Sequence, residues 1–487
     1  MEVLLKIWIF FVNNILTQPA YFIGFIVLIG YILLKKPWYE CLAGFLKATV
    51  GYLILTVGSG GLVSNFRPIL VGLKDKFNLQ ATVIDPYYGQ NAVQSAMEHI
   101  GKSFSQVMLL LLIAFIFNIL LVAFRKITKI RSIFTTGNVQ IQQAATAFWL
   151  IFFCFPELGD TPILIVMSLL LGLYWAVGSN LTVEITQDLT EGGGFCVAHQ
   201  QIFALKIFST IAEKIKGKGE GKKLEDIKLP GFLSIFNENM VSTAILMLLF
   251  FGVILITLGK DYLIENKFMK EGQSFFFYTL TTALYFAVYL AILQLGVRTF
   301  VTELTQSFQG ISTRLLPGAV PGIDCAATFG FGSANAVTIG LLFGAAGQFL
   351  AIITLILLKS PVIIIAGFIP VFFDNATIAV FANNRGGVKA ACILPFISGL
   401  CQVFGSAFIS YWVGLAAYGG YLGMWDWAVL WPGFTIIMKY LGYIGIGIVA
   451  LILIAIPQIQ YFRNKDTYFL ITDDYEAYKE KMKSKVN

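Results

Sequence analysis

The stretch SQVMLLLLIAFIFNILLVAF (residues 105–124) runs for a full membrane's length without a charged side chain. About 20 apolar residues in a helix are enough to cross the hydrocarbon core of a bilayer. Similar runs recur along the 487-residue chain, which is 57% hydrophobic and only 13% charged. Soluble globular proteins carry about 25% charged residues. The composition therefore argues against a soluble domain and predicts an all-α polytopic membrane protein.

The apolar runs predict about eleven transmembrane helices. They lie near residues 15–34, 41–57, 105–124, 140–155, 161–179, 240–259, 275–297, 334–358, 362–381, 389–415 and 434–457. Loops rich in lysine and arginine remain on the cytoplasmic side of a membrane. The loop after the fifth run carries seven lysines between residues 206 and 228. All strongly basic loops fall on one side if the N-terminus is outside and the C-terminus is cytoplasmic.

Two polar segments, 58–104 and 298–333, must return to the side from which they started if the count is eleven. Non-helical backbone at membrane depth is tolerated only where it is buried in protein or lines a wet cavity. We therefore expect both segments to be re-entrant and to help build a binding site.

These two segments also suggest an internal duplication. TVGSGGLVSNF (56–66) aligns with QLGVRTFVTEL (294–304), and about twenty residues later both copies read Ile-Asp. The halves would have opposite topology, which is the inverted-repeat plan of secondary transporters. We expect a first five-helix half at 1–233, a second at 234–433, and an extra span with a cytoplasmic tail at 434–487.

Cysteine usage and charge exclude several other classes of protein. The six cysteines lack the close spacing of metal or redox motifs, so we interpret them as small buried hydrophobic residues. No zinc, haem, iron–sulfur centre or other cofactor is expected. The net charge of +7 resides in loops and in the tail, which does not indicate nucleic-acid binding.

Three acidic residues lie where lipid-facing sequence is expected. Asp324 lies in the helix-breaking stretch GAVPGIDCAATFGFGSAN, Asp85 is its counterpart in the first re-entrant segment, and Asp374 precedes Asn375. Carboxylates inside a membrane are costly and usually face a functional cavity. The alternative is that each acid caps the N-terminus of a broken helix.

Amide side chains gather at the start of the fourth predicted span. Gln142 lies four residues after Asn138, so the two share a face of a helix. They could present several hydrogen-bonding groups to one ligand. An interfacial collar of polar residues is the alternative.

His199 follows the glycine triplet 192–194 and precedes Gln200 and Gln201. Imidazole beside amides suits a compact hydroxylated solute, because these groups give directional hydrogen bonds without a fixed charge. His199 could also serve as a base toward a hydroxyl group. The alternative is a structural histidine. No metal site is expected.

Four stretches identify a family resemblance. They read GGGFCVAHQQIFALK (192–206), LPGFLSIFNENMVSTAI (229–245), GVRTFVTELTQSFQGISTRLLPGAVPGIDCAA (296–327) and GFIPVFFDNATIAVFANNRGG (367–387). Together they closely resemble the L-ascorbate-specific enzyme IIC component of the bacterial phosphoenolpyruvate-dependent sugar phosphotransferase system. The likeness runs from about residue 1 to 455.

The resemblance implies a permease that takes up L-ascorbate and releases it inside as the 6-phosphate. It implies a homodimer in the bacterial inner membrane, with a V-motif scaffold and a substrate-holding core. The residues that match the family's binding groups are Tyr87, Gln142, His199, Gln200 and Asp324. Two positions depart from the family pattern, which commonly has a histidine at Asn138 and a threonine at Pro86.

The chain shows no loop suited to a phosphorylated cysteine, so we expect a separate phosphocysteine-bearing IIB protein, recharged by a IIA protein. Phosphoryl transfer would then depend on the IIB partner rather than on this chain alone. The loop 206–228 and the turn at 383–389 are basic enough to seat such a partner, or they only follow the charge rule for cytoplasmic loops.

Two other classes of function stay open at the level of sequence. One is a proton-coupled secondary transporter of a sugar acid, with Asp324 and His199 carrying protons. The other is an intramembrane enzyme that uses His199 and Asp324 as a general-base pair.

Overall fold

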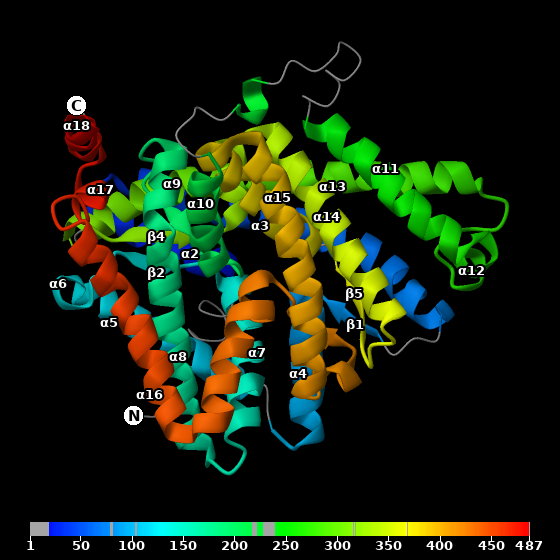
Figure 1. Cartoon of the computed structure of the whole chain (residues 1–487). Helices are drawn as coiled ribbons and strands as arrows, with labels where there is room; N and C mark the ends of the chain where they lie inside the picture. The colour runs from blue at the N-terminus through cyan, green and yellow to red at the C-terminus, as the bar shows by residue number, and fades with distance from the viewer. Residues whose placement is uncertain are drawn as a thin grey trace.

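The computed structural model describes residues 19–77, 81–102, 105–216, 222–226, 239–314, 316, 318–367 and 369–486. The start of the first predicted span, parts of the basic loop 206–228 and the predicted boundary at 233/234 lie outside these residues. The side chain of Tyr87 also lies outside what is described. The described chain is mostly helical (Figure 1).

Most of the described residues before residue 217 lie in long helices. They are α2 (Pro19–Leu33), α3 (Trp38–Phe77), α4 (Pro86–His99), α5 (Ser105–Ala123), α7 (Gly137–Cys154), α8 (Asp160–Leu181) and α10 (Ile202–Lys216), with the short α6 (Arg125–Thr128) and α9 (Val183–Thr190). After residue 238 follow α11 (Asn239–Leu258), α12 (Lys260–Glu265), α13 (Phe275–Arg314), α14 (Ala334–Leu357), α15 (Asn375–Trp412), α16 (Trp431–Arg463), α17 (Leu470–Asp473) and α18 (Tyr475–Val486).

Several of these helices are long and apolar enough to cross a membrane. Among the described residues, five segments meet both criteria: Trp38–Gly58, Asp160–Thr190, Ala334–Leu357, Pro370–Trp412 and Asp426–Arg463. Shorter apolar helices occur at Ile23–Leu33, Leu109–Ala123 and Phe275–Tyr289. The protein is therefore a polytopic membrane protein, as its composition predicts.

The all-α prediction, with its two re-entrant segments, did not include the six short strands that the described residues form. They are β1 (Ala81–Ile84), β2 (Ser132–Phe134), β3 (Cys196–Val197), β4 (Val320–Ile323), β5 (Ile363–Ala366) and β6 (Gly420–Tyr421). The predicted helix at 362–381 accordingly begins as β5 and enters a π-helical turn, η5 (Pro370–Asp374). Backbone groups that leave a helix inside a membrane must find other partners, and pairing between these strands provides them.

The six strands form two parallel three-stranded sheets. One has the order β5-β1-β6 and the other β2-β4-β3. In each sheet the central strand comes from one part of the chain and both edge strands come from the other part. The sheets therefore join segments that are far apart in sequence.

The two re-entrant segments begin differently from our expectation. Both start as continuations of 40-residue helices, α3 and α13, before reaching β1 and β4. These long helices pack against each other and against α2, while α11 packs on α13. Gly51 lies in the α3–α13 contact, where an added Cβ would come within 2.7 Å of the backbone N of Phe300. We call α2, α3, α11 and α13 the four-helix scaffold.

Replacing Gly51 by alanine should loosen the scaffold, because the new methyl group meets backbone atoms that cannot rotate away. We expect a loss of about 1–3 kcal/mol in stability, seen as a lower midpoint in thermal unfolding of the detergent-purified protein. Gly60→Ala is the matched control in the same helix, since no described atom lies within 4 Å of its added Cβ. Equal midpoints for the two variants would contradict close packing at Gly51.

Candidate substrate site

The sheet β2-β4-β3 brings two of the predicted site residues, His199 and Asp324, together at one edge. Asp324 directly follows β4, and His199 comes two residues after β3. The amide of Ala198 donates to the carbonyl of Ile323 at 2.7 Å, which aligns the two strand ends. The ends of parallel strands meet at the same edge of a sheet, so residues 125 positions apart become neighbours.

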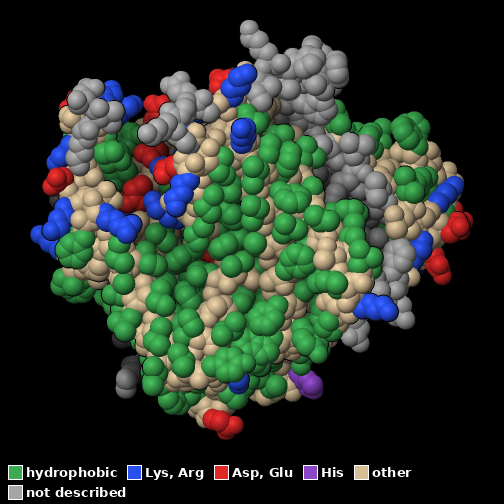
Figure 2. Space-filling view, in the orientation of Figure 1, with side chains coloured by type: hydrophobic (Ala, Val, Ile, Leu, Met, Phe, Trp, Pro, Cys, Tyr) green, Lys and Arg blue, Asp and Glu red, His purple; other side chains and the backbone are tan. Residues whose placement is uncertain are grey.

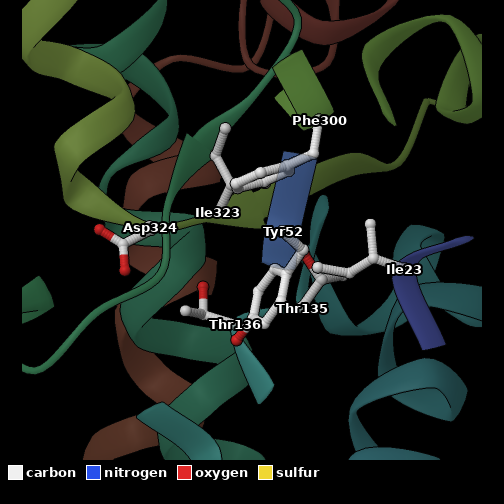
Figure 3. Close-up of a pocket in the computed structure, with 7 residues that line it drawn as sticks. All are labelled: Ile23, Tyr52, Thr135, Thr136, Phe300, Ile323 and Asp324. Carbon is white, nitrogen blue, oxygen red and sulfur yellow. The ribbon is translucent and has the colours of Figure 1, made fainter. Parts of the chain in front are cut away.

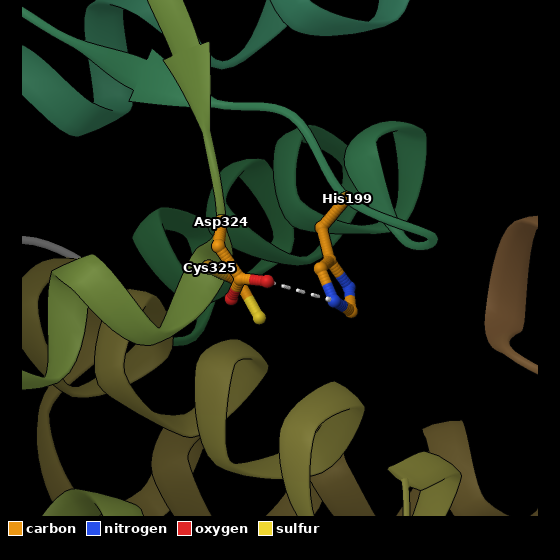
Figure 4. Close-up of side chains that lie close together, drawn as sticks. All are labelled: His199, Asp324 and Cys325. Atoms are coloured by element: carbon orange, nitrogen blue, oxygen red, sulfur yellow. Dashed lines mark ion pairs between the residues drawn. The ribbon is translucent and has the colours of Figure 1, made fainter. Parts of the chain in front are cut away.

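His199 and Asp324 point toward each other (Figure 4). Nε2 of His199 lies 3.7 Å from Oδ2 of Asp324, and both side chains are largely buried. This distance is too long for a direct hydrogen bond. A hydroxyl group placed between the two could donate to one of them, and a solute with two neighbouring hydroxyl groups could donate to both.

The tautomer of His199 follows from its other neighbours. Gln201 donates from Nε2 to the carbonyl of Phe373 at 3.3 Å, so its Oε1 faces Nδ1 of His199, 2.7 Å away. This oxygen can only accept a hydrogen bond, and Nδ1 therefore carries the proton in the neutral ring. The lone pair is then on Nε2, which faces Asp324.

The amide pair Gln142 and Gln200 completes the site. Gln200 donates from Nε2 to Oε1 of Gln142 at 3.0 Å. Oε1 of Gln200 is buried and has no hydrogen-bond partner among the described residues. A buried unsatisfied acceptor is costly, so this oxygen suits a donor supplied by a ligand.

Asp324 also caps a helix, which was the alternative interpretation of this residue. Its Oδ1 accepts from the amide of Ala326 at 2.9 Å, at the start of the 3-10 helix η4 (Cys325–Gly330). The capping contact uses one carboxylate oxygen and leaves the other toward His199. The two interpretations are therefore compatible.

Asn138 lies where the site meets the four-helix scaffold. Tyr52 of α3 donates its hydroxyl hydrogen to Oδ1 of Asn138 at 3.0 Å. A small pocket opens beside this contact (Figure 3). Its lining combines scaffold residues Ile23, Tyr52 and Phe300 with Thr135 and Thr136 between β2 and α7, and with Ile323 and Asp324 at the end of β4.

The remaining candidates lie in segments that follow strands β1 and β5 of the other sheet. Asp85 follows β1, and its amide donates to the carbonyl of Tyr421 at 2.9 Å. Asp374 and Asn375 are fully buried around Gln402 of α15. Tyr87 belongs to α4. Asp374 is nevertheless adjacent to Phe373, whose ring stacks on His199 with 6.3 Å between centroids.

Asp426 is a supporting residue that sequence reasoning missed. Its carboxylate accepts from the amides of Phe203 and Ala204 at 2.9 and 3.0 Å, and from the hydroxyl of Tyr174 at 2.8 Å. These amides form the first turn of α10, directly after the His199–Gln201 segment. An acid within the apolar stretch WDWAVLW was the signal available in the sequence.

Gln143 fixes the same segment from the other side. It donates to the carbonyl of His199 at 3.1 Å and accepts from Nε1 of Trp175 at 2.6 Å. Both contacts are buried. The glutamines at this helix start are therefore buried inside the protein, which argues against the alternative of an interfacial collar.

The thiol of Cys325 lies close to His199 and Asp324, and the three side chains together offer atoms that could hold a metal ion. Cys325 is buried beside Asp324, and one ligand atom from each of His199, Asp324 and Cys325 lies within 4.8 Å of the others (Figure 4). Nε2 of His199, Oε1 of Gln200 and Oδ2 of Asp324 are hydrogen-bond acceptors of the kind that hold hydroxyl groups.

Fold and site together define a polytopic membrane protein with a buried cluster of hydrogen-bonding side chains. Residues 14–428 match the model of the family described as the PTS system sugar-specific permease component. The chain belongs to this family, EIIC-GAT. It is also 33% identical over 434 residues to the "Ascorbate-specific PTS system EIIC component" of Mycoplasma pneumoniae. The match covers 81% of this chain and 65% of that relative, so the chain spans about two thirds of the relative's length.

Asp426→Ala should destabilise the site segment, because it leaves two amides of α10 and the hydroxyl of Tyr174 without an acceptor. Losing partners for buried donors costs about 1–3 kcal/mol each, so thermal unfolding should begin at a clearly lower temperature. Asp261→Ala, at the exposed first turn of α12, is the control and should change little. An unchanged midpoint in Asp426→Ala would show that α10 does not depend on this cap.

Proposed function

We propose that this chain takes up L-ascorbate by alternating access and delivers it for phosphorylation to ascorbate 6-phosphate. The observation that carries this proposal is the buried convergence of His199, Gln142, Gln200 and Asp324 around the edge of one sheet. The name of the Mycoplasma pneumoniae relative supports ascorbate as the substrate.

The chemistry of the site suits a compact solute with several hydroxyl groups. Nε2 of His199, Oε1 of Gln200 and Oδ2 of Asp324 are acceptors, and such a solute supplies donors. A site that offers buried acceptors discriminates strongly against analogues that lack the matching hydroxyl. Asn138 keeps its amide nitrogen as a donor while its oxygen receives the hydroxyl of Tyr52.

The architecture that we propose is an inverted repeat of two five-helix halves, 1–233 and 234–433, with 434–487 as an extra span and tail. The two 40-residue helices, each followed by a four-residue strand ending in isoleucine and then by aspartate, support it. The sheet orders support it as well. If β1, β2 and β3 are exchanged with β4, β5 and β6 respectively, the order β5-β1-β6 becomes β2-β4-β3.

The four-helix scaffold would be the V-motif and the dimerising part, and the two sheets with their helices would be the moving core. The pocket in Figure 3 lies between scaffold residues and core residues. A relative movement of these parts would expose the site first to one side of the membrane and then to the other.

Charge supports a multi-pass topology in a bacterial inner membrane with the C-terminus cytoplasmic and the N-terminus outside. In Figure 2 lysine and arginine side chains gather toward the end that carries α9, α10 and α18, next to a largely apolar body. Such positive loops stay cytoplasmic.

Phosphorylation would require a cytoplasmic IIB protein with a phosphocysteine, recharged by IIA. The sugar hydroxyl would attack phosphorus, the S–P bond would break with the thiolate as leaving group, and His199 is the candidate base for the hydroxyl proton. Arg385 of the basic turn at 383–389 is already paired with Asp188 and Glu213. The lysines of the loop 206–228 are therefore the better candidates for seating the partner.

The competing function is proton-coupled transport of a sugar acid. Accumulation that survives loss of the phosphate donor but collapses with a protonophore would favour it. An intramembrane enzyme would instead form product without any soluble partner.

Uptake of labelled L-ascorbate tests the site in proteoliposomes with phosphorylated IIB on the inside. His199→Ala and Gln142→Ala should each reduce uptake about tenfold or more, because each removes a buried hydrogen-bonding partner. His99→Ala is the matched control, since His99 is exposed and contacts Tyr418 at 2.7 Å. Normal uptake by both site variants would show that the sugar binds elsewhere.

A further inference from the structure

A buried polar cluster that is not part of the substrate site lies in the helical segments that follow β5 of the sheet β5-β1-β6 and in the helix α14 before it. We call it the Asp374 cluster, and it consists of Asp374, Asn375, Gln348 and Gln402. All four side chains are at most 1% exposed. They come from η5, α14 and α15, and amide-to-oxygen contacts link Gln348 to Gln402 and Gln402 to Asp374.

The carboxyl group of Asp374 is satisfied on one oxygen only. Oδ2 accepts from Nε2 of Gln402 and from the amide of Trp425 at 2.8 Å. Oδ1 is buried and has no hydrogen-bond partner in the described part of the chain. No ion pair between described residues involves Asp374.

The titratable groups close to Asp374 supply no positive charge. Asp426 and Tyr174 come from the segments packed beside it, and Cys325 from the neighbouring η4. None of them is a cation. A buried carboxylate without a positive partner is costly, and such a group is usually neutralised.

Little space remains for a metal ion with its own oxygen shell. Gly399 of α15 lies so close to α14 that an added Cβ would come within 2.9 Å of the backbone N of Gln348. At Gly340 the same addition would meet the Cβ of Ala379 at 2.6 Å. The smallest cation, a proton, needs no such space.

We propose that Asp374 is a proton-binding site and that it carries a neutral carboxyl group in this conformation. Asp426, the other buried acid nearby, is the contrasting case. Both of its oxygens accept hydrogen bonds, and two of the three donors are amides at the start of α10. A helix N-terminus stabilises an anion, so the ionised form of Asp426 is better stabilised than that of Asp374.

The proton site is connected to the substrate site through one residue. Phe373 precedes Asp374 in η5, its carbonyl accepts from Gln201, and its ring stacks on His199. A charge on Asp374 would disturb this turn and with it the orientation of His199. The effect of Asp374 on substrate affinity rests on the proposed function, whereas the protonation of Asp374 does not.

Infrared difference spectroscopy of the purified full chain tests the proposal at neutral pH. The wild type should show the carbonyl-stretch band of a buried protonated carboxyl group, shifted in D2O. Asp374→Asn should remove the band, Asp374→Glu should move it, and Asp426→Asn should leave it in place. No such band in the wild type, or an unmoved band in the Asp374 variants, would overturn the proposal.

L-Ascorbate binding to the same samples keeps the two claims distinguishable. Asp374→Asn mimics the neutral acid, so its affinity should stay within about threefold of the wild type. A larger loss would overturn the link between the proton and the site. If the wild type shows the band but does not bind L-ascorbate, the proposed substrate fails and the proton site stands.

Discussion

The need to satisfy backbone hydrogen bonds away from water constrains this structure more than any other factor. A helix that ends at membrane depth leaves amides and carbonyls without partners, each costing several kcal/mol. Here the broken ends are joined into two small parallel sheets, β5-β1-β6 and β2-β4-β3. Side chains such as Asp324 and Asp426 cap the turns that follow. The irregular backbone is thus buried in protein rather than exposed to lipid.

The same pairing explains why the polar groups converge. Each strand ends near a residue with hydrogen-bonding or acidic character, and parallel pairing brings the three ends of a sheet to one edge. In one sheet this edge brings together His199 and Asp324, which we propose to bind the solute. In the other sheet, β5 is followed by the turn η5, which ends at Asp374 beside its amide neighbours. One architectural device thus builds two polar clusters with different chemistry.

Much of the site could be predicted from the sequence because polar residues are conspicuous in an apolar chain. His199, Gln200 and Gln142 were expected together. In the structure the side chain of Gln200 bonds to Gln142, and the carbonyl of His199 accepts from the neighbouring Gln143. The strands could not be predicted, since two to four residues show no alternating pattern. Asp426 was missed because its role depends on α10, which is distant in sequence. Asp374 and Asp85 were grouped with the substrate site because sequence does not reveal which sheet a strand joins.

The most direct test of the convergence is a double-mutant cycle on L-ascorbate affinity, using His199→Ala, Asp324→Ala and the double variant. Residues that share one ligand and lie 3.7 Å apart should show a coupling free energy of about 0.5–3 kcal/mol. Losses in binding free energy that add to within about 0.5 kcal/mol would mean that the two side chains act independently, which would contradict a single shared site.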